Sequence, residues 1–394
     1  MEVVIASAVR TAIGKFGGAL AATPPTQMAS EVAQAAMKRA GVQARSVNEA
    51  YFGNVIHTEP KDMYLARVTA LQAGMSDEAP ALTLNRLCGS GLQAVVSGAE
   101  AITLGNAQVV LAGGAESMSR SGHLVSSVRF GQKMGDTVSQ DMMTGALHDP
   151  FGHGHMGVTA ENIAAKNTIE RDRQDQVALR SHQRAAAAIK SGRFRSQILA
   201  VEVKRGRDRV MFDEDEHVRA EVTLEELASL PAAFQKGGSV TAGNSSGIND
   251  GASALVLTSA KFAESDDLQP LAIIRATGLG GVAPEVMGLG PIPATQQALA
   301  RAGLGIDDLA VIESNEAFAA QCAAVADQLE FPEQITNPNG GAIALGHPVG
   351  ASGAIILTKL VHELRRINGR YGLATMCIGG GQGIAVVIEN PEAS

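Results

Sequence analysis

The chain contains a weak internal repeat, which constrains the fold more strongly than any other feature of the sequence. Residues 36–42 (AMKRAGV) are echoed by residues 298–304 (ALARAGL). An apolar segment follows each copy, at residues 50–54 and 311–315, so each copy indicates a helix, a glycine that ends it and a strand. Chance similarity is the alternative for such short segments. The repeat otherwise predicts two related α/β halves.

Each copy of the repeat is followed by a glycine-rich turn that opens a helical pattern, at residues 88–91 and 346–350. Each half then reaches an apolar strand that runs into glycines, at residues 109–114 and 374–381. Open α/β folds bind ligands at the carboxyl ends of their strands, so the two turns should lie at matching ends. Strands that alternate with helices favour a mostly parallel or mixed sheet covered by helices.

The region between the halves has a different composition. Histidine, methionine and glycine gather at residues 142–157, a charged helical pattern covers 159–191, and turn residues close the region near 240–251. We therefore expect an inserted domain. The predicted boundaries are 1–118 plus 250–270 for the first half, 119–249 for the insertion and 271–394 for the second half.

Composition limits the function classes. The formal net charge of −8 argues against a nucleic-acid partner, and the single dense basic run, residues 204–209, is interpreted as a solvated hairpin or loop. No apolar run approaches the roughly 20 residues that span a bilayer. The three cysteines form no CxxC pair, and the chain begins without a basic or apolar leader. A cytoplasmic protein is the resulting expectation.

Cys88 is the first candidate for chemistry. It lies after an apolar stretch and before GSGLQAVV, which predicts a position at the N-terminal end of a helix. The helix dipole and free N–H groups there favour an anion, so we expect the pKa of this thiol to be lowered. A buried, inert cysteine is an equally good interpretation of this segment alone.

Residues 89–94 (GSGLQA) also match the dinucleotide fingerprint GxGxxA, which would indicate a dehydrogenase. That motif should open the βαβ unit and be followed about 20 residues later by an acidic residue at the end of the second strand. Here two glycines and an alanine precede Glu116, and a cysteine precedes the turn. This alternative is therefore disfavoured.

Three further residues could take part in chemistry. His347 is flanked by glycine and proline on a turn that opens a helix, which suits a base that must reach a substrate. Cys377 precedes a glycine run whose backbone N–H groups, including that of Gly379, could face an oxyanion. Asn315 ends a strand and could orient a water or an oxyanion. Cys322, in a small-residue helix, is interpreted as core packing.

The histidines at positions 148, 153 and 155 raise the possibility of a metal site. Their spacing matches no HExxH or Cys/His zinc pattern, and the only nearby acidic partner is Asp149. We therefore expect no metal.

Four segments together resemble the catalytic blocks of the thiolase family, in family order: residues 85–91 (NRLCGSG), 315–318 (NEAF), 346–353 (GHPVGASG) and 377–383 (CIGGGQG). The similarity extends over nearly the whole chain. The resemblance implies an α/β thiolase fold of duplicated βαβαβαββ halves in five α-β-α-β-α layers, with an inserted loop domain and usually a homotetramer.

The resemblance also implies the chemistry, a reversible Claisen condensation of acetyl-CoA with acyl-CoA. Cys88 would carry the acyl group after His347 takes its proton, and Cys377 would be the second acid/base. Asn315, through a water, and His347 would stabilise one oxyanion, and the N–H groups of Cys88 and Gly379 the other. Ketoacyl synthases, which use Cys-His-His, and non-catalytic thiolase-like lipid carriers are the alternatives.

Coenzyme A would be a substrate, with no prosthetic group. By matching motif positions it would contact the insertion and the second half, at Leu147, His155, Met156, Arg219, Phe234, Ala242, Ser246, Ala317 and Phe318. Met287 would line the acyl pocket. Residues 57–65 and 146–151 look closest to bacterial short-chain β-ketothiolases, particularly those that supply polyester precursors.

Overall fold

The computed structural model describes residues 1–393, apart from the side chain of Arg205, and is built on one large mixed sheet. The neighbouring strands run in the order β13 (Leu309–Ser314), β14 (Tyr371–Ile378), β15 (Gln382–Glu389), β12 (Ala272–Gly281), β1 (Val3–Thr11), β11 (Asn249–Ser259), β5 (Val109–Ser117), β3 (Glu49–Gly53) and β4 (Ala81–Leu84). The first four belong to the predicted second half and the others to the first.

The two halves join through a short pairing. Strands β1 and β12 pair only from Val3 to Ile5, whereas each continues alongside its other neighbours for most of its length. Two helices, α3 (Ser90–Thr103) and α12 (Val349–Arg366), pack on each other and on strands of both halves. They form the central layer of the molecule, with Leu92 and Leu357 fully buried in its core.

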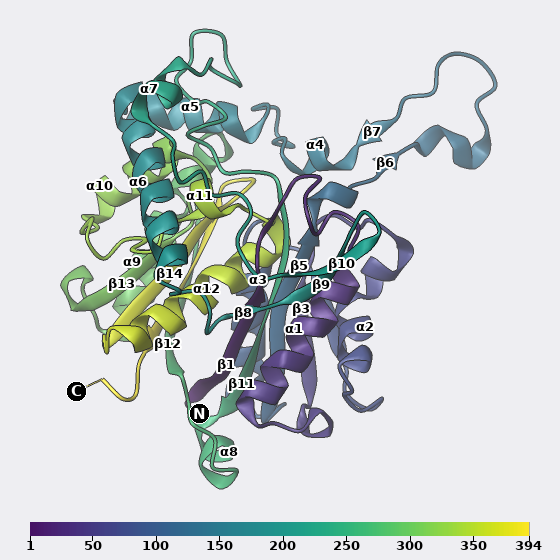
Figure 1. Cartoon of the computed structure of the whole chain (residues 1–394), viewed down its shortest axis with the longest axis vertical. Helices are drawn as coiled ribbons and strands as arrows, with labels where there is room; N and C mark the ends of the chain where they lie inside the picture. The colour runs from purple at the N-terminus through teal and green to yellow at the C-terminus, as the bar shows by residue number, and fades with distance from the viewer. Residues whose placement is uncertain (394) are drawn as a thin grey trace.

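Helices also cover the outer faces of both halves (Figure 1). Helices α1 (Pro25–Ala40) and α2 (Leu65–Gln72) cover the first half, and α9 (Pro291–Ala302) and α10 (Ala319–Leu329) cover the second. Five α-β-α-β-α layers result, as the family resemblance implied. The repeated glycines Gly41 and Gly303 both end their helices in the left-handed conformation, with φ of 72° and 68°.

The halves differ in one strand. The first half follows the order βαβαβαββ, but in the second the third strand is reduced to a single parallel bridge between Ile312 and Thr336. Pro332 and Pro338 flank this segment, and Asn337 has a φ of 46°. Proline lacks an N–H donor and Asn337 leaves the extended conformation, so the strand cannot lengthen.

The inserted region leaves the sheet after β5 and returns at β11. Its helices are α4 (Met142–Ala146), α5 (Met156–Lys166), α6 (Arg171–Lys190) and α7 (Leu224–Ser229). It is not wholly separate from the first half, because its short strand β8 (Ile198–Leu199) pairs with β1. The basic run lies in the hairpin of β9 (Val201–Arg205) and β10 (Asp208–Phe212), so the hairpin interpretation is confirmed.

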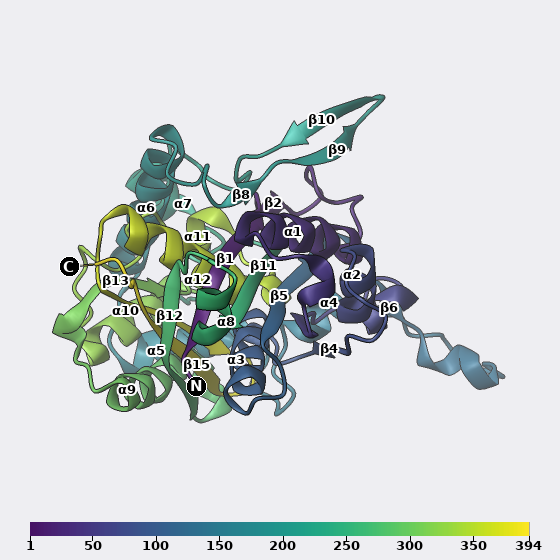
Figure 2. The ribbon, with the colours of Figure 1, turned by 90° about the horizontal axis from the view of Figure 1, so that it is seen from below.

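A long arm projects from the body of the molecule at the start of the insertion. It leaves through β6 (His123–Leu124) and returns through β7 (Gln140–Asp141), and both views show it standing clear of the other elements (Figures 1 and 2). Phe130 and Met134 in the arm are 92% and 88% exposed. No helix in the described part of the chain is both long enough and apolar enough to cross a membrane.

The contact between α3 and α12 depends on glycine. A Cβ on Gly353 would overlap the backbone nitrogen of Leu92, and a Cβ on Gly91 would lie 2.8 Å from the nitrogen of Ala354. We expect Gly353→Ala to force the helices apart and lower the free energy of unfolding by about 1–3 kcal/mol, the usual cost of overpacking. Urea denaturation at fixed protein concentration measures this.

The control for this prediction is Gly122→Ala, at a site where an added Cβ meets nothing within 4 Å. It should change the free energy of unfolding by no more than about 0.5 kcal/mol. Equal stability of the two variants would contradict the proposed role of the helix contact.

Candidate active site

A cavity of about 690 Å³ opens between the two halves and the inserted region. Cys88, His347, Cys377 and Gly379 all line it, although they come from turns and strands far apart in the sequence. The structure also places every predicted coenzyme A contact and the predicted acyl-pocket residue around this cavity: Leu147, His155, Met156, Arg219, Phe234, Ala242, Ser246, Met287, Ala317 and Phe318.

A tight turn holds Cys88 two residues before the start of α3. Leu87 has a φ of 46°, and its N–H donates to the Asn85 side-chain oxygen at 2.8 Å. Ser90 closes the turn: its hydroxyl oxygen accepts the Arg86 N–H at 2.8 Å, and the hydroxyl donates to the Leu87 carbonyl at 2.7 Å. The turn therefore fixes the direction of the Cys88 side chain.

The expected lowering of the Cys88 pKa was wrong. Although the cavity leaves this residue partly exposed, burial of the thiol is the largest influence and raises its pKa to about 11. The backbone N–H groups of Gly379 and Cys88 act in the opposite direction and only reduce the rise. Desolvation outweighs the helix dipole here because the thiolate would lose more hydration than these N–H groups replace.

His347 is held at the turn before α12. Its backbone N–H donates to the Asn249 side-chain oxygen at 2.9 Å, and its ring Nδ1 lies 2.6 Å from the Ser352 hydroxyl oxygen. Burial lowers its pKa to about 4, so the ring is neutral at ordinary pH. Ring Nε2 has no hydrogen-bond partner among the residues that the structure describes. A neutral thiol and a neutral imidazole thus face the same cavity.

Cys377 lies near the end of β14, where the chain turns into β15 through Gly379, Gly380 and Gly381. The last two have φ of 81° and 86°, which a residue with a side chain rarely adopts. Cys377 is 1% exposed, and burial, followed by the proximity of Cys88, raises its pKa. Cys377 is therefore a neutral thiol, which can donate a proton.

Asn315 does not line the main cavity. It lies just beyond β13 and lines a small separate space that Gly346 and Ser352 also line. Its side-chain Nδ2 is buried and has no hydrogen-bond partner within the described part of the chain. Cys322, in α10, is absent from the lining of both spaces, and its sulfur lies 3.9 Å from the Asn315 carbonyl oxygen.

Glu116 is a site residue that the sequence reasoning missed. Fully buried in β5, it accepts N–H bonds from Val55 at 3.0 Å, Ile56 at 3.1 Å and Gly350 at 2.9 Å. Gly350 is in the first turn of α12, so this carboxyl group ties the helix that follows His347 to the first half. A lone acidic residue within the otherwise apolar strand 109–117 was the available signal.

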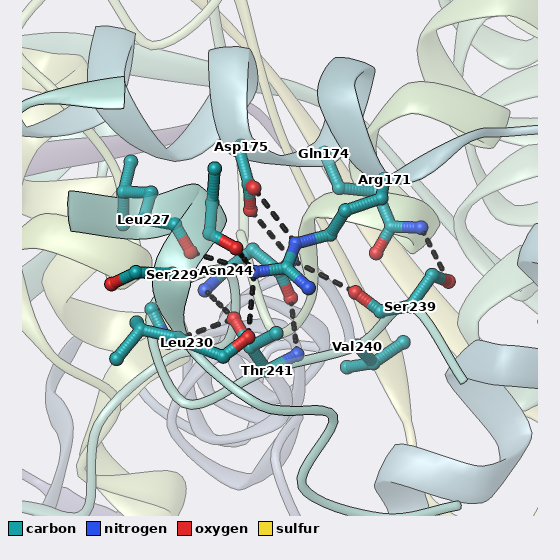
Figure 3. A network of polar contacts seen from close by, with 12 residues as sticks. Arg171, Gln174, Asp175, Leu227, Ser229, Leu230, Ser239, Val240, Thr241 and Asn244 are labelled. Atoms are coloured by element: carbon teal, nitrogen blue, oxygen red, sulfur yellow. Dashed lines mark hydrogen bonds and ion pairs between the residues drawn. The ribbon is translucent and has the colours of Figure 1, made fainter. Parts of the chain in front are cut away.

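A buried polar network supports the insertion's side of the cavity (Figure 3). Arg171 Nε donates to Asp175 at 2.7 Å, and the opposite carboxylate oxygen of Asp175 accepts from Asn244 Nδ2 at 2.9 Å. The Asn244 side-chain oxygen then accepts the Thr241 N–H at 2.8 Å. The network fixes the turn that carries Ala242 and Ser246. The Ser246 N–H reaches the second half, donating to the Ala317 carbonyl at 2.9 Å.

Aromatic rings form another wall of the cavity. The His155 ring stacks on Phe234 with centroids 4.7 Å apart, and Phe234 meets Phe318 edge-on at 6.0 Å. His148 approaches His155 edge-on at 5.2 Å. His148 and His155 therefore contact other aromatic rings with their own rings. Within the described residues, no group of three or more histidine, cysteine or acidic side chains could hold a metal ion.

Known proteins resemble this chain over nearly its whole length. The family model described as thiolase, N-terminal domain matches residues 3–261, and that described as thiolase, C-terminal domain matches residues 268–390. The Cupriavidus necator protein Beta-ketothiolase BktB is 54% identical over 389 residues, which cover 98% of this chain and 99% of that protein. An acetyl-CoA acetyltransferase of Chromobacterium violaceum is 48% identical, covering 99% and 100%.

Solved structures are also similar to this chain over nearly its whole length. Human mitochondrial 3-ketoacyl-CoA thiolase in complex with CoA matches with a TM-score of 0.96 and 44% identity, covering 99% of this chain and 98% of that one. The Bacillus anthracis acetyl-CoA acetyltransferase matches with a TM-score of 0.96 and 45% identity, with the same coverage. The similarity includes both halves and the insertion.

The protonation states of the two facing groups generate a pH prediction. The Cys88 thiol ionises only as pH rises through about 11, and His347 becomes charged only as pH falls through about 4. We therefore expect no ionisation of Cys88 between about pH 6 and pH 9 in the free protein. Thiolate ultraviolet absorbance, taken as the difference between the protein and its Cys88→Ala variant, measures this. A difference signal that titrates near neutral pH would show a preformed thiolate instead.

Proposed function

This chain belongs to the thiolase family of acyltransferases, and we propose that it uses Cys88, His347 and Cys377 for reversible Claisen condensation of acetyl-CoA with a short acyl-CoA. The reverse reaction cleaves a 3-ketoacyl-CoA with coenzyme A. One observation carries the assignment: two thiols and the unpartnered Nε2 of a neutral histidine line one cavity, together with all the predicted coenzyme A contacts.

The first half of cleavage transfers the acyl group to Cys88. Nε2 of His347 takes the thiol proton as the sulfur attacks the ketone carbon of the substrate, and the backbone N–H groups of Cys88 and Gly379 face the resulting oxyanion. The bond between the α and β carbons then breaks. Its electron pair becomes the enolate of acetyl-CoA, which Cys377 protonates, leaving Cys377 as a thiolate and Cys88 as an acyl thioester.

The second half regenerates both groups. The Cys377 thiolate takes the proton of an incoming coenzyme A thiol, whose sulfur attacks the acyl thioester. Cys88 leaves and recovers its proton from His347. Two acid/base groups are needed because each half-reaction moves one proton on each side of the acyl carbon. Asn315 keeps the role that the family resemblance implies: its Nδ2, which has no partner among the described residues, would hold a water that stabilises the enolate oxygen together with His347.

Coenzyme A lies along the insertion in this proposal, between the aromatic wall and the turn at Ala242 and Ser246. The cavity wall is mostly apolar, which suits the pantetheine chain, and Arg219 supplies a positive charge for the phosphates. Met287 and Met156 border the acyl end. Methionine side chains adapt their shape, which supports short acyl groups of more than one length. The relative named Beta-ketothiolase BktB supports the same substrate class.

We also propose that the protein is a cytoplasmic homotetramer. Free thiols at Cys88, Cys322 and Cys377 fit a reducing compartment. The arm supports assembly because Val128, Phe130 and Met134 project away from the body, and a surface this apolar is stabilised when another copy covers it.

Removing the nucleophile tests the reaction. In Cys88→Ala, coenzyme-A-dependent loss of acetoacetyl-CoA should fall at least about 1000-fold, since no acyl enzyme can form. Cys322→Ala, which removes a thiol outside the cavity, is the matched control and should keep its rate. Undiminished turnover in Cys88→Ala would overturn the proposed function.

The same chemistry predicts where the acyl group rests. Acetyl-CoA alone should acetylate one residue, Cys88, and peptide mass spectrometry after acid quench locates it. An acetyl group on Cys377 or Cys322 would reverse the assigned roles.

The arm generates a separate prediction about assembly. Phe130→Asp places a charge on the most exposed apolar residue of the arm and should convert tetramers to dimers, which sedimentation velocity detects. Leu104→Asp, also at an exposed apolar residue but outside the arm, should leave the mass unchanged. If the native protein itself sediments as a dimer, the tetramer proposal fails.

A further inference from the structure

The two ring nitrogens of His347 have different surroundings. Nε2 belongs to the side chain that lines the cavity and has no partner among the described residues, whereas Nδ1 lies 2.6 Å from Ser352 Oγ. Ser352 is 3% exposed and sits in the second turn of α12. It does not line the main cavity. Its hydroxyl therefore reaches the reaction only through His347.

The hydroxyl proton of Ser352 has a fixed direction. Ser352 Oγ lies 2.9 Å from the Pro348 carbonyl oxygen, which can only accept a hydrogen bond. If the hydroxyl donated to His347 instead, two oxygen atoms would face each other at 2.9 Å with no proton between them. The arrangement that satisfies all three groups has Ser352 donating to Pro348 and accepting from Nδ1–H of His347.

From this geometry we propose that Ser352 is a positioning residue that holds His347 in the tautomer with its proton on Nδ1 and its lone pair on Nε2. This inference rests on the proposed function, in which Nε2 takes the proton of Cys88. The opposite tautomer would present an N–H to the thiol and could not act as a base.

The partner is a neutral hydroxyl rather than a carboxylate, and this has a chemical consequence. A carboxylate on Nδ1 would stabilise the imidazolium and retain the proton, as the aspartate of a Ser-His-Asp triad does. Ser352 orients the ring without adding negative charge, so His347 returns the proton readily when Cys88 leaves the acyl group. Proton return is required in both directions of a reversible reaction.

Ser352→Ala tests the assignment. Without the hydroxyl, either Nδ1–H stays buried and unpaired or the ring adopts the other tautomer, and both reduce the fraction of competent base. We expect kcat for acetoacetyl-CoA thiolysis to fall about 10- to 100-fold while KM for coenzyme A changes less than about twofold. Ser352→Thr keeps the hydroxyl and should recover most of kcat.

A second readout does not depend on turnover. The rate at which iodoacetamide alkylates Cys88 near neutral pH should also fall in Ser352→Ala, because His347 no longer assists loss of the thiol proton. The control is Thr358→Val, which removes a buried hydroxyl from the same helix, 2.9 Å from Ser253 Oγ; Thr358 lines neither the main cavity nor the small space beside Asn315 and Ser352. Its kcat and alkylation rate should match those of the native protein.

These experiments distinguish failure of the proposed Ser352 role from failure of the proposed function. The positioning role is overturned if Ser352→Ala keeps native kcat and alkylation rate, or if Thr358→Val loses both to the same extent, since the effect would then be general to the helix. If Ser352→Thr does not fold, the alanine variant and its control still decide the question. Turnover that persists in Cys88→Ala would instead remove the proposed function, whatever Ser352 does.

Discussion

The close contact between α3 and α12 is the constraint on which the rest of the structure depends. Each helix begins directly after a turn that carries a candidate catalytic residue, Cys88 before α3 and His347 before α12, so the separation of the helices sets the separation of the two groups. Gly91 and Gly353 permit the contact because a side chain at either position would meet the backbone of the other helix. Glu116 adds a polar tie between the start of α12 and the first half.

Burial determines the electrostatics of the site. It raises the pKa of Cys88 and lowers that of His347, so both groups are neutral in the free protein. In the proposed mechanism, ionisation of Cys88 therefore has to accompany acyl transfer, with the proton passing to His347 as the sulfur attacks. The second thiol, Cys377, is also buried, but among residues of the insertion and the second half, and burial raises its pKa as well.

Local sequence patterns predicted much of the fold. The paired helix, glycine and strand segments correctly indicated two related halves, because a glycine in the left-handed conformation ends a helix wherever it occurs. The four family blocks indicated the residues that surround the cavity. Local patterns failed where distant atoms decide the outcome. The pKa of Cys88 was expected to fall because of its own helix, but burial among residues of both halves raises it.

The sequence by itself determined the duplicated α/β halves and the glycine helix ends, and it indicated the candidate reactive side chains, since these depend on patterns of neighbouring residues. Only the tertiary structure decided that two thiols and His347 share one cavity, their protonation states, the polar ties made by Glu116 and Ser352, and the exposure of the arm. The physical reason is that desolvation and hydrogen bonding depend on atoms brought together from positions hundreds of residues apart, such as Glu116 and Gly350.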